Sequence, residues 1–267
     1  MIIDFHTHIF PDKMAQKTID FLSSKGGIPA FSDGTKQGLL SRMEKAGVDV
    51  CVTLPVITNP AQFDSINRFA ADINREFADE QRRLISFAGI HPDCEDIDGK
   101  MASIAKSGFL GVKIHPDYQG TYINDERYVR ILECAAEHDL VVITHAGVDV
   151  AYSEVHCPPE LALELIRRVP YAKLVLAHLG GVDMLDKSLD LLCGENVYLD
   201  TAYVLRFVGE ERFKKMLERH GEDKILFASD SPWSDIRGDV EILRSFGISD
   251  TAKQKIFCEN ARALLKI

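Results

Sequence analysis

The sequence lacks several features that mark whole classes of protein. No C-x-x-C pair occurs among its six cysteines, and no apolar run approaches the roughly 20 residues that span a membrane. Lysine and arginine total 31 against 41 acidic residues, so the formal net charge is −10, and no basic run occurs. This acidic balance disfavours nucleic acid and anionic membranes as partners, because both require basic surfaces.

The cysteines and the first residues also limit the setting of the protein. The cysteines are scattered along the chain at Cys51, Cys94, Cys134, Cys157, Cys193 and Cys258. This pattern is typical of reduced, mostly buried thiols in a cytosolic protein. The chain begins directly with strand-like residues, so we expect no signal peptide and a cytoplasmic location. The expected partner is a small-molecule substrate, and the sequence allows for a homodimer.

Short apolar segments alternate with amphipathic segments along the whole chain. The eight segments expected to be strands are 2–6, 49–55, 84–90, 111–115, 141–145, 173–178, 197–201 and 225–229. The segments expected to be helices are 36–46, 63–80, 97–107, 126–138, 159–169, 182–193, 210–220 and 237–246, with a last helix at about 250–265. The strands are apolar throughout, as is typical of parallel strands that are buried on both faces.

Eight β-then-α units over about 250 residues are the expected content of a (β/α)8 TIM barrel. The main alternative is an open, doubly wound sheet, which would carry a glycine-rich phosphate turn after its first strand. Here histidines occupy that place. We therefore predict an α/β fold with one (β/α)8 domain over residues 1–267.

Two histidines near the start of the chain are the most informative residues. Residues 2–10 read Ile-Ile-Asp-Phe-His-Thr-His-Ile-Phe. Side chains alternate between the two faces of a strand, so His6 and His8 are expected to point the same way. Two adjacent imidazoles supply two-thirds of a typical three-ligand catalytic zinc site.

Other predicted strands also end in polar residues of the ligand type. These residues are Lys113 and His115 on the fourth strand, His145 on the fifth, His178 on the sixth and Asp230 on the eighth. In a (β/α)8 barrel the active site lies at the carboxyl ends of the strands, so these side chains should meet. Imidazole and carboxylate ligands suit Zn²⁺, Mn²⁺ or Fe²⁺, and such a metal lowers the pKa of a bound water to about 7.

This ordered set of residues resembles the amidohydrolase superfamily of metal-dependent hydrolases. In detail it is most similar to the amidohydrolase-related branch that also contains aminocarboxymuconate-semialdehyde-type decarboxylases. The motifs that carry the resemblance are F-x-G-V-K-I-H-P (109–116), H-L-G-G (178–181), F-A-S-D-S-P-W (227–233) and E-N-A-R-A-L-L (259–265).

The resemblance implies roles for individual residues. The implied ligands of one divalent metal, expected to be Zn²⁺ with Mn²⁺ or Fe²⁺ as alternatives, are His6, His8, His145 and Asp230. His178 would be the general acid or base, and Asp230 would also move a proton. In relatives with two metals, a carboxylated lysine on the fourth strand bridges them; Lys113 and His178 would then hold the second metal. We prefer one metal, with Lys113 as an interior lysine paired with an acid such as Asp4.

Three further residues are candidates for contacting the substrate. His115 shares a strand face with Lys113 and could line the pocket. Arg206, after the seventh strand, is the best available cation for a substrate carboxylate. Trp233, the single tryptophan, directly follows Asp230-Ser231-Pro232 and could form a pocket wall.

The sequence leaves the reaction open. The first hypothesis is a metal-dependent hydrolase that acts on a small amide, lactone or ester through a metal-activated water. The alternative is a non-oxidative decarboxylase of a small carboxylic acid that uses the same site. A third hypothesis, a barrel that binds metal or ligand without turnover, is disfavoured because it does not require titratable residues beyond the ligands.

Overall fold

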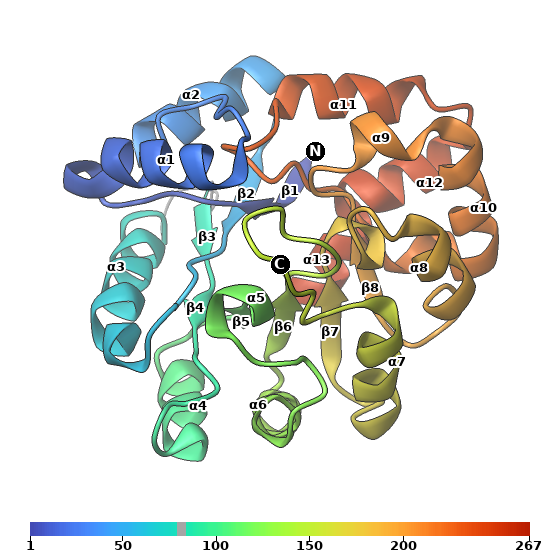
Figure 1. Ribbon diagram of the computed structural model, residues 1–267. Coiled ribbons are helices and arrows are strands. Elements are labelled where there is room, and N and C mark those ends of the chain that lie inside the picture. Colours follow the sequence, from blue (N-terminus) through green and yellow to red (C-terminus); the bar gives the residue numbers. More distant parts are fainter. Residues whose placement is uncertain (79–83) are drawn as a thin grey trace.

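The structure is a computed structural model that describes residues 1–78 and 84–267. It consists of parallel strands surrounded by a ring of helices (Figure 1). The strands are β1 (Ile3–Thr7), β2 (Val50–Thr53), β3 (Leu84–Ser86), β4 (Ala88–Gly89), β5 (Gly111–Ile114), β6 (Val141–Thr144), β7 (Lys173–Leu176), β8 (Tyr198–Asp200) and β9 (Ile225–Leu226). The predicted strand 84–90 is divided into β3 and β4, which together fill one strand position.

The strands close into a barrel. Two parallel sheets have the orders β1-β2-β3 and β4-β5-β6-β7-β8-β9. Phe87 lies between β3 and β4, where one sheet meets the other, and its backbone N–H donates to the carbonyl of Thr53 at 3.0 Å. Where β9 meets β1, the N–H of Phe5 donates to the carbonyl of Phe227 at 2.9 Å, and a parallel bridge joins Thr7 to Ser231. The eight strand positions therefore form the (β/α)8 barrel that the sequence predicts.

The helices follow the strands in turn. They are α1 (Asp12–Gly26), α2 (Lys36–Ala46), α3 (Phe63–Glu76), α4 (Ile97–Lys106), α5 (Pro116–Gln119), α6 (Glu126–Glu137), α7 (Pro159–Arg168), α8 (Leu185–Leu191), α9 (Leu205–Val208), α10 (Glu210–His220), α11 (Ile236–Ser245), α12 (Asp250–Gln254) and α13 (Asn260–Leu265). The predicted helix 63–80 ends at Glu76, and its residues 79 and 80 lie outside the described residues. The helices α1, α5 and α9, which all follow strand ends, were not predicted from the sequence.

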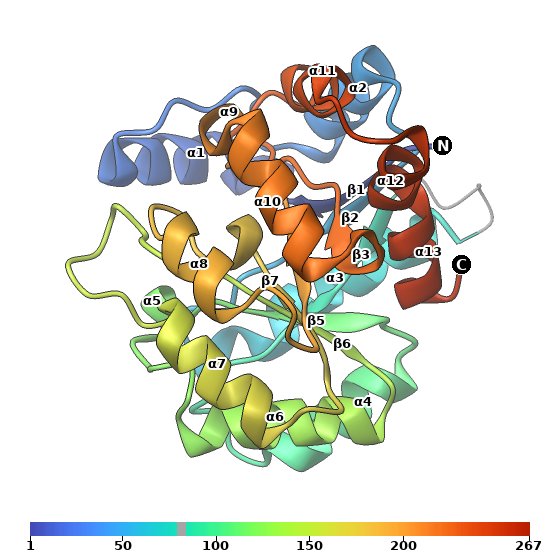
Figure 2. The same ribbon diagram turned by 90° about the vertical axis from the view of Figure 1, so that its right-hand side faces the viewer.

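Two groups of buried apolar residues hold the barrel together. The inner group comes from alternate strand positions such as Phe5, Val52 and Ile143, and it includes Leu264 and Leu265 of α13. The outer group lies between the strands and the surrounding helices. Figure 2 shows α13 at the right, at the opposite end of the barrel from α1. The helix α13 therefore closes the amino end of the barrel and leaves the carboxyl end for the polar residues.

Two other sequence predictions concern membrane-spanning segments and the cysteine thiols. Within the described chain, no helix combines the length and the apolar character needed to cross a bilayer. The cysteines form no disulfide bond in the described structure, and only Cys193 is more than slightly exposed. Both findings agree with the composition.

Candidate metal centre

Three predicted ligands converge at the carboxyl end of the barrel. The Nε2 atoms of His6 and His8 lie 3.2 Å apart. Oδ1 of Asp230 lies 3.5 Å from Nε2 of His6 and 3.3 Å from Nε2 of His8. The three side chains are largely buried, and these atoms can surround a single ion. They come from the first strand and from the segment after the last strand, which the barrel brings together.

In each imidazole, the hydrogen-bond partner of Nδ1 determines which nitrogen carries the lone pair. Nδ1 of His8 lies 2.8 Å from the carbonyl oxygen of Leu54, which can only accept a hydrogen bond. Nδ1 of His6 lies 2.9 Å from Oδ2 of Asp200. Both histidines therefore carry their proton on Nδ1, and both Nε2 lone pairs face the shared centre.

Lone pairs that converge in this way repel one another unless a cation lies between them. Oδ1 of Asp230 is buried and has no hydrogen-bond partner among the described residues. Three atoms separated by 3.2 to 3.5 Å lie about 2 Å from a common centre, which is the usual distance from Zn²⁺ to nitrogen or oxygen. The donor set therefore fits a divalent metal ion.

Lys113 lies beside this donor set. Its Nζ is 3.3 Å from Nε2 of His6, and the side chain is almost completely buried. Burial lowers the pKa of Lys113 to about 8, and burial together with the nearby lysine lowers the pKa of His6. The predicted pairing of Lys113 with Asp4 is wrong. Asp4 accepts hydrogen bonds from the backbone and hydroxyl of Ser229, whereas Lys113 contacts Nε2 of His6, a predicted metal ligand.

His178 and His145 form a second pair of imidazoles next to the first. Nδ1 of His178 lies 2.9 Å from the carbonyl oxygen of Ala202, and its Nε2 lies 3.0 Å from Nδ1 of His145. Nε2 of His145 faces Oδ2 of Asp117 at 3.7 Å. Neither of these last two atoms has a hydrogen-bond partner in the described part of the chain. His178 is thus held at Nδ1 by a backbone carbonyl, and its Nε2 faces the neighbouring imidazole of His145.

The role of His145 as a metal ligand stays a prediction. Its ring nitrogens face His178 and Asp117 rather than the three converging donors, so ligation requires one of these contacts to be exchanged. His145, His115 and Asp149 also place donor atoms close together. However, the imidazole rings of His115 and His145 are stacked, with centroids 4.4 Å apart and planes 6° from parallel. The lone pairs of stacked rings lie in parallel planes and do not point at one ion, so this second group is not a metal site as it is arranged.

The backbone is strained at several residues of the site. His178, Tyr203 and Asp230 have φ values of 60°, 66° and 71°, a left-handed conformation that non-glycine residues rarely adopt. Each residue follows a barrel strand within a few positions. Such strain costs on the order of 1–3 kcal/mol per residue and is concentrated at functional sites in proteins.

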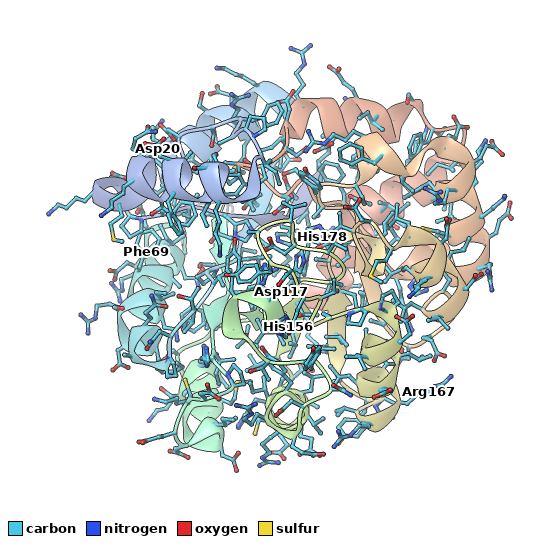
Figure 3. The ribbon with its side chains drawn as sticks, in the orientation of Figure 1. Asp20, Phe69, Asp117, His156, Arg167 and His178 are labelled. Atoms are coloured by element: carbon cyan, nitrogen blue, oxygen red, sulfur yellow. The ribbon has the colours of Figure 1, made fainter. Side chains whose placement is uncertain are left out.

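Two buried aspartates of the site were missed by the sequence analysis. Asp200 ends β8 and contacts His6, and it would have been found by applying the strand-end criterion to the seventh predicted strand. Asp117 accepts a hydrogen bond from Nδ1 of His156 at 2.9 Å, across 39 residues of sequence. Figure 3 shows Asp117, His156 and His178 toward the middle of the molecule, inside the ring of helices. No local pattern indicates the second contact.

The remaining predicted residues lie around the centre. His115 is buried and stacks on Tyr118 with centroids 4.0 Å apart. Arg206 is exposed, and it donates a hydrogen bond to the carbonyl of Trp233 at 3.1 Å. Its guanidinium lies 4.4 Å from the ring centre of Tyr203. Arg206 and Trp233 are therefore in contact with each other, as two residues of one pocket rim would be.

The loop between β6 and α7 lies across the carboxyl end of the barrel (Figure 1). Its Tyr152 lies 5.3 Å from the ring centre of Tyr118. The Nζ atom of Lys25, at the end of α1, lies 3.8 Å from the ring centre of Tyr152. Asp149 of the same loop lies 3.6 Å from Nε2 of His115. This end of the barrel is thus lined by aromatic rings and two cations, Lys25 and Arg206.

Comparison with known proteins agrees with this geometry. A family model described as Amidohydrolase matches residues 3–267. The chain belongs to the amidohydrolase family. No sequence among curated proteins matches this amidohydrolase. The family assignment agrees with the divalent metal that the donor set fits.

Solved structures resemble this amidohydrolase over its whole length. A 2,6-dihydroxybenzoate decarboxylase from Rhizobium gives a TM-score of 0.75 at 16% identity, over 99% of this chain and 98% of the other. A 5-carboxyvanillate decarboxylase from Sphingomonas paucimobilis gives 0.72 at 16%, over 100% and 99%. A dihydroxybenzoic acid decarboxylase from Polaromonas sp. JS666, with bound manganese and 2-nitroresorcinol, gives 0.74 at 16%, over 99% and 96%. At this identity the likeness establishes the fold.

Proposed function

We propose that this member of the amidohydrolase family is a metal-dependent, non-oxidative decarboxylase of a small aromatic carboxylic acid. The observation that carries the proposal is the convergence of His6, His8 and Asp230 on one centre, with His178 beside it. The structurally similar decarboxylases of dihydroxybenzoates and carboxyvanillate support the reaction type. The aromatic rings and cations at the mouth of the barrel support a planar, negatively charged substrate.

The ligand residues have a limited task in this proposal. His6, His8 and Asp230 hold the metal, and His145 is the predicted fourth ligand. The bound metal supplies a Lewis acid that attracts substrate oxygens. Manganese accompanies one of the similar decarboxylases, so Mn²⁺ is considered beside the Zn²⁺ that the ligand types suggest. Lys113 adds a second centre of positive charge next to His6.

His178 moves the proton. The bond between the ring carbon and the carboxylate breaks, its electron pair stays on the carbon, and carbon dioxide leaves. The carbon then takes a proton from Nε2 of His178. Because the carbonyl of Ala202 keeps a hydrogen on Nδ1, this step requires the ring to be protonated on both nitrogens, and the solvent returns the proton after turnover. The carboxylate substrate thus loses CO₂ and gains H⁺, so the reaction needs no oxidant or reductant. Arg206 and Lys25 attract the anionic substrate, and the aromatic side chains exclude water from the developing charge.

Hydrolysis of an amide, lactone or ester is the second candidate. It is favoured by the position of Asp230, whose carboxylate lies within the donor set and can accept a proton from an attacking water. Decarboxylation releases CO₂, whereas hydrolysis splits the substrate and consumes water. The products therefore distinguish the two reactions.

The test is a substrate panel on protein reconstituted separately with Mn²⁺ and with Zn²⁺. One half of the panel contains hydroxylated and methoxylated benzoates and is followed by CO₂ release. The other half contains amides, lactones and esters and is followed by acid formation. We expect CO₂ from at least one benzoate, and a rate lower by roughly 100-fold or more in the Asp230→Asn variant. Turnover confined to the second half of the panel would replace decarboxylation with hydrolysis.

A further inference from the structure

Asp200 makes three hydrogen bonds at the bottom of the metal centre. Its Oδ1 accepts from the backbone N–H groups of His178 at 2.8 Å and Ala202 at 3.0 Å. Its Oδ2 lies 2.9 Å from Nδ1 of His6. Asp200 has no exposed surface. The carboxylate of Asp200 thus contacts the side chain of His6 and the backbone of both His178 and Ala202.

These contacts fix which atoms carry hydrogen. A backbone N–H can only donate, so Oδ1 of Asp200 must be an acceptor. An ionised Oδ2 can also only accept, so Nδ1 of His6 must be the protonated nitrogen. Nε2 of His6 is then left with its lone pair directed at His8 and Asp230.

We propose that Asp200 is a positioning residue that keeps His6 in the tautomer able to bind the metal. It also connects this tautomer to the backbone that places His178. The proposal rests on the metal site proposed above. It goes beyond that site because Asp200 touches neither the metal nor the substrate.

The substitution Asp200→Asn separates this role from general packing. The amide oxygen can keep the two backbone hydrogen bonds, and the NH₂ group then takes the place of Oδ2. This NH₂ group donates to Nδ1 of His6, which forces the proton of the imidazole onto Nε2. In that state Nε2 has no lone pair for a metal. The exchange of a carboxylate for an amide should therefore prevent His6 from binding the metal, without a change in side-chain volume.

Asp4 offers a matched control. Its Oδ1 accepts from the backbone N–H groups of Ser229 at 2.9 Å and His6 at 3.2 Å, and its Oδ2 accepts from the hydroxyl of Ser229 at 2.5 Å. It is as fully buried as Asp200. The hydroxyl group can rotate and accept from an amide, so Asp4→Asn leaves the tautomer of His6 unchanged.

The first measurement is the ¹⁵N NMR spectrum of the metal-free protein at pH 8, where His6 is identified by its absence from a His6→Gln variant. We expect hydrogen on Nδ1 of His6 in the wild type and in Asp4→Asn, and on Nε2 in Asp200→Asn. The second is calorimetric titration with Zn²⁺ and Mn²⁺. We expect the affinity of Asp200→Asn to fall at least 10- to 100-fold, the usual scale for a lost partner of a metal ligand, and that of Asp4→Asn to stay near wild type.

Several outcomes overturn the proposal. One is a wild-type His6 protonated on Nε2, which decides the question even where Asp200→Asn does not fold. Another is an equal loss of affinity in both variants, which would reduce Asp200 to a packing residue. By contrast, a wild-type protein that keeps hydrogen on Nδ1 but binds no metal would refute the proposed function and leave the positioning role supported.

Discussion

At the scale of single residues, the metal centre depends on acceptors that lie behind the histidines. His8 is held by the carbonyl of Leu54, a backbone group that side-chain substitution does not remove. His6 is held by the side chain of Asp200, which can be changed. The two proposed ligands look equivalent in the sequence, but the protonated nitrogen of His6 is therefore the one that a single side-chain substitution can change.

Asp230 is the residue whose charge the centre most needs. The variant Asp230→Asn keeps the shape but removes the negative charge and the basicity, so we expect a folded protein with weakened metal binding. Turnover should fall by roughly 100-fold or more. Elemental analysis of the purified protein, beside steady-state kinetics, measures both effects. The control is Asp235→Asn, at the half-buried N-cap of α11, whose amide oxygen can still cap the helix. Wild-type metal content and rate in Asp230→Asn would remove Asp230 from the site.

His178 should affect the rate and spare the metal. Its substitution by alanine removes the proposed proton donor, so turnover should fall by roughly 100-fold or more. Metal content should stay close to wild type, because Nε2 of His178 faces His145 and not the three donors. The buried His91, which also follows a strand, provides the control as His91→Ala. A variant of His178 that loses half of its metal would show that His178 is a ligand and that two metals are present.

The sequence predicts which residues meet better than it predicts how they meet. The strand-end criterion selects His6, His8, His178 and Asp230, which lie near one another because every strand of the barrel ends on the same side. Strand alternation was less reliable. The pairing of β1 with β2 shifts between Asp4 and Thr7, and Asp4 turns to Ser229 rather than joining the histidines. Such irregularities depend on neighbouring strands and leave no local pattern.

At the scale of secondary structure elements, the strands and the amphipathic helices were predictable, whereas the elements near the mouth were not. The helix α2 has the predicted bounds, because a buried apolar stripe and a glycine end define it. The helix α1 buries only Ala15 and Ile19, and Pro11 before it provides no side-chain cap. Its exposed Met14 and Phe21 place apolar residues outside the buried face, so the helical spacing of apolar residues is less regular. Helices that cover a site have less contact with the core, so their sequences carry a weaker signal.

Helix α11 carries a pH-dependent contribution to stability. Asp239, in its first turn, is buried and accepts a hydrogen bond from Ser234 at 2.6 Å. Burial raises the pKa of Asp239 from 3.8 to about 7. The folded state therefore binds this proton more tightly than the unfolded state. The resulting stabilisation is fully present below pH 4 and is lost as the pH rises through 7.

The variant Asp239→Asn tests this contribution, because its amide does not ionise. We expect the free energy of unfolding of the wild type to fall relative to the variant between pH 5 and pH 8, by about 1.4 kcal/mol for each unit of pKa shift that lies in this range. Urea denaturation at the two pH values measures the difference, and Asp250→Asn on the exposed start of α12 controls for loss of a charge. A difference that does not change with pH would contradict the assignment.

At the scale of the whole molecule, the proposed metal joins the two ends of the barrel. His6 and His8 belong to the first strand, and Asp230 follows the last strand. Hydrogen bonds already close the seam between these strands: backbone bonds join Phe5 to Phe227, Asp230 to His6 and His8 to Ser231, and Ser229 donates to the carboxylate of Asp4. A metal held across this seam ties residues that are far apart in the sequence, so its binding is coupled to closure of the barrel.

Metal binding should therefore raise the melting temperature of the protein. An ion at 100 times its dissociation constant stabilises the folded state by about 2.7 kcal/mol, provided that it does not bind the unfolded chain. For a chain of this size, each kcal/mol shifts Tm by roughly 2–4 °C, so we expect a rise of about 5–10 °C when chelator-treated protein receives Zn²⁺ or Mn²⁺. Scanning calorimetry with and without metal measures the shift, and Asp230→Asn should show little of it. Activity should disappear with the metal and return with it. A wild-type protein that is shown to be metal-free, yet melts at the same temperature and turns over at the full rate, would exclude a metal from the site.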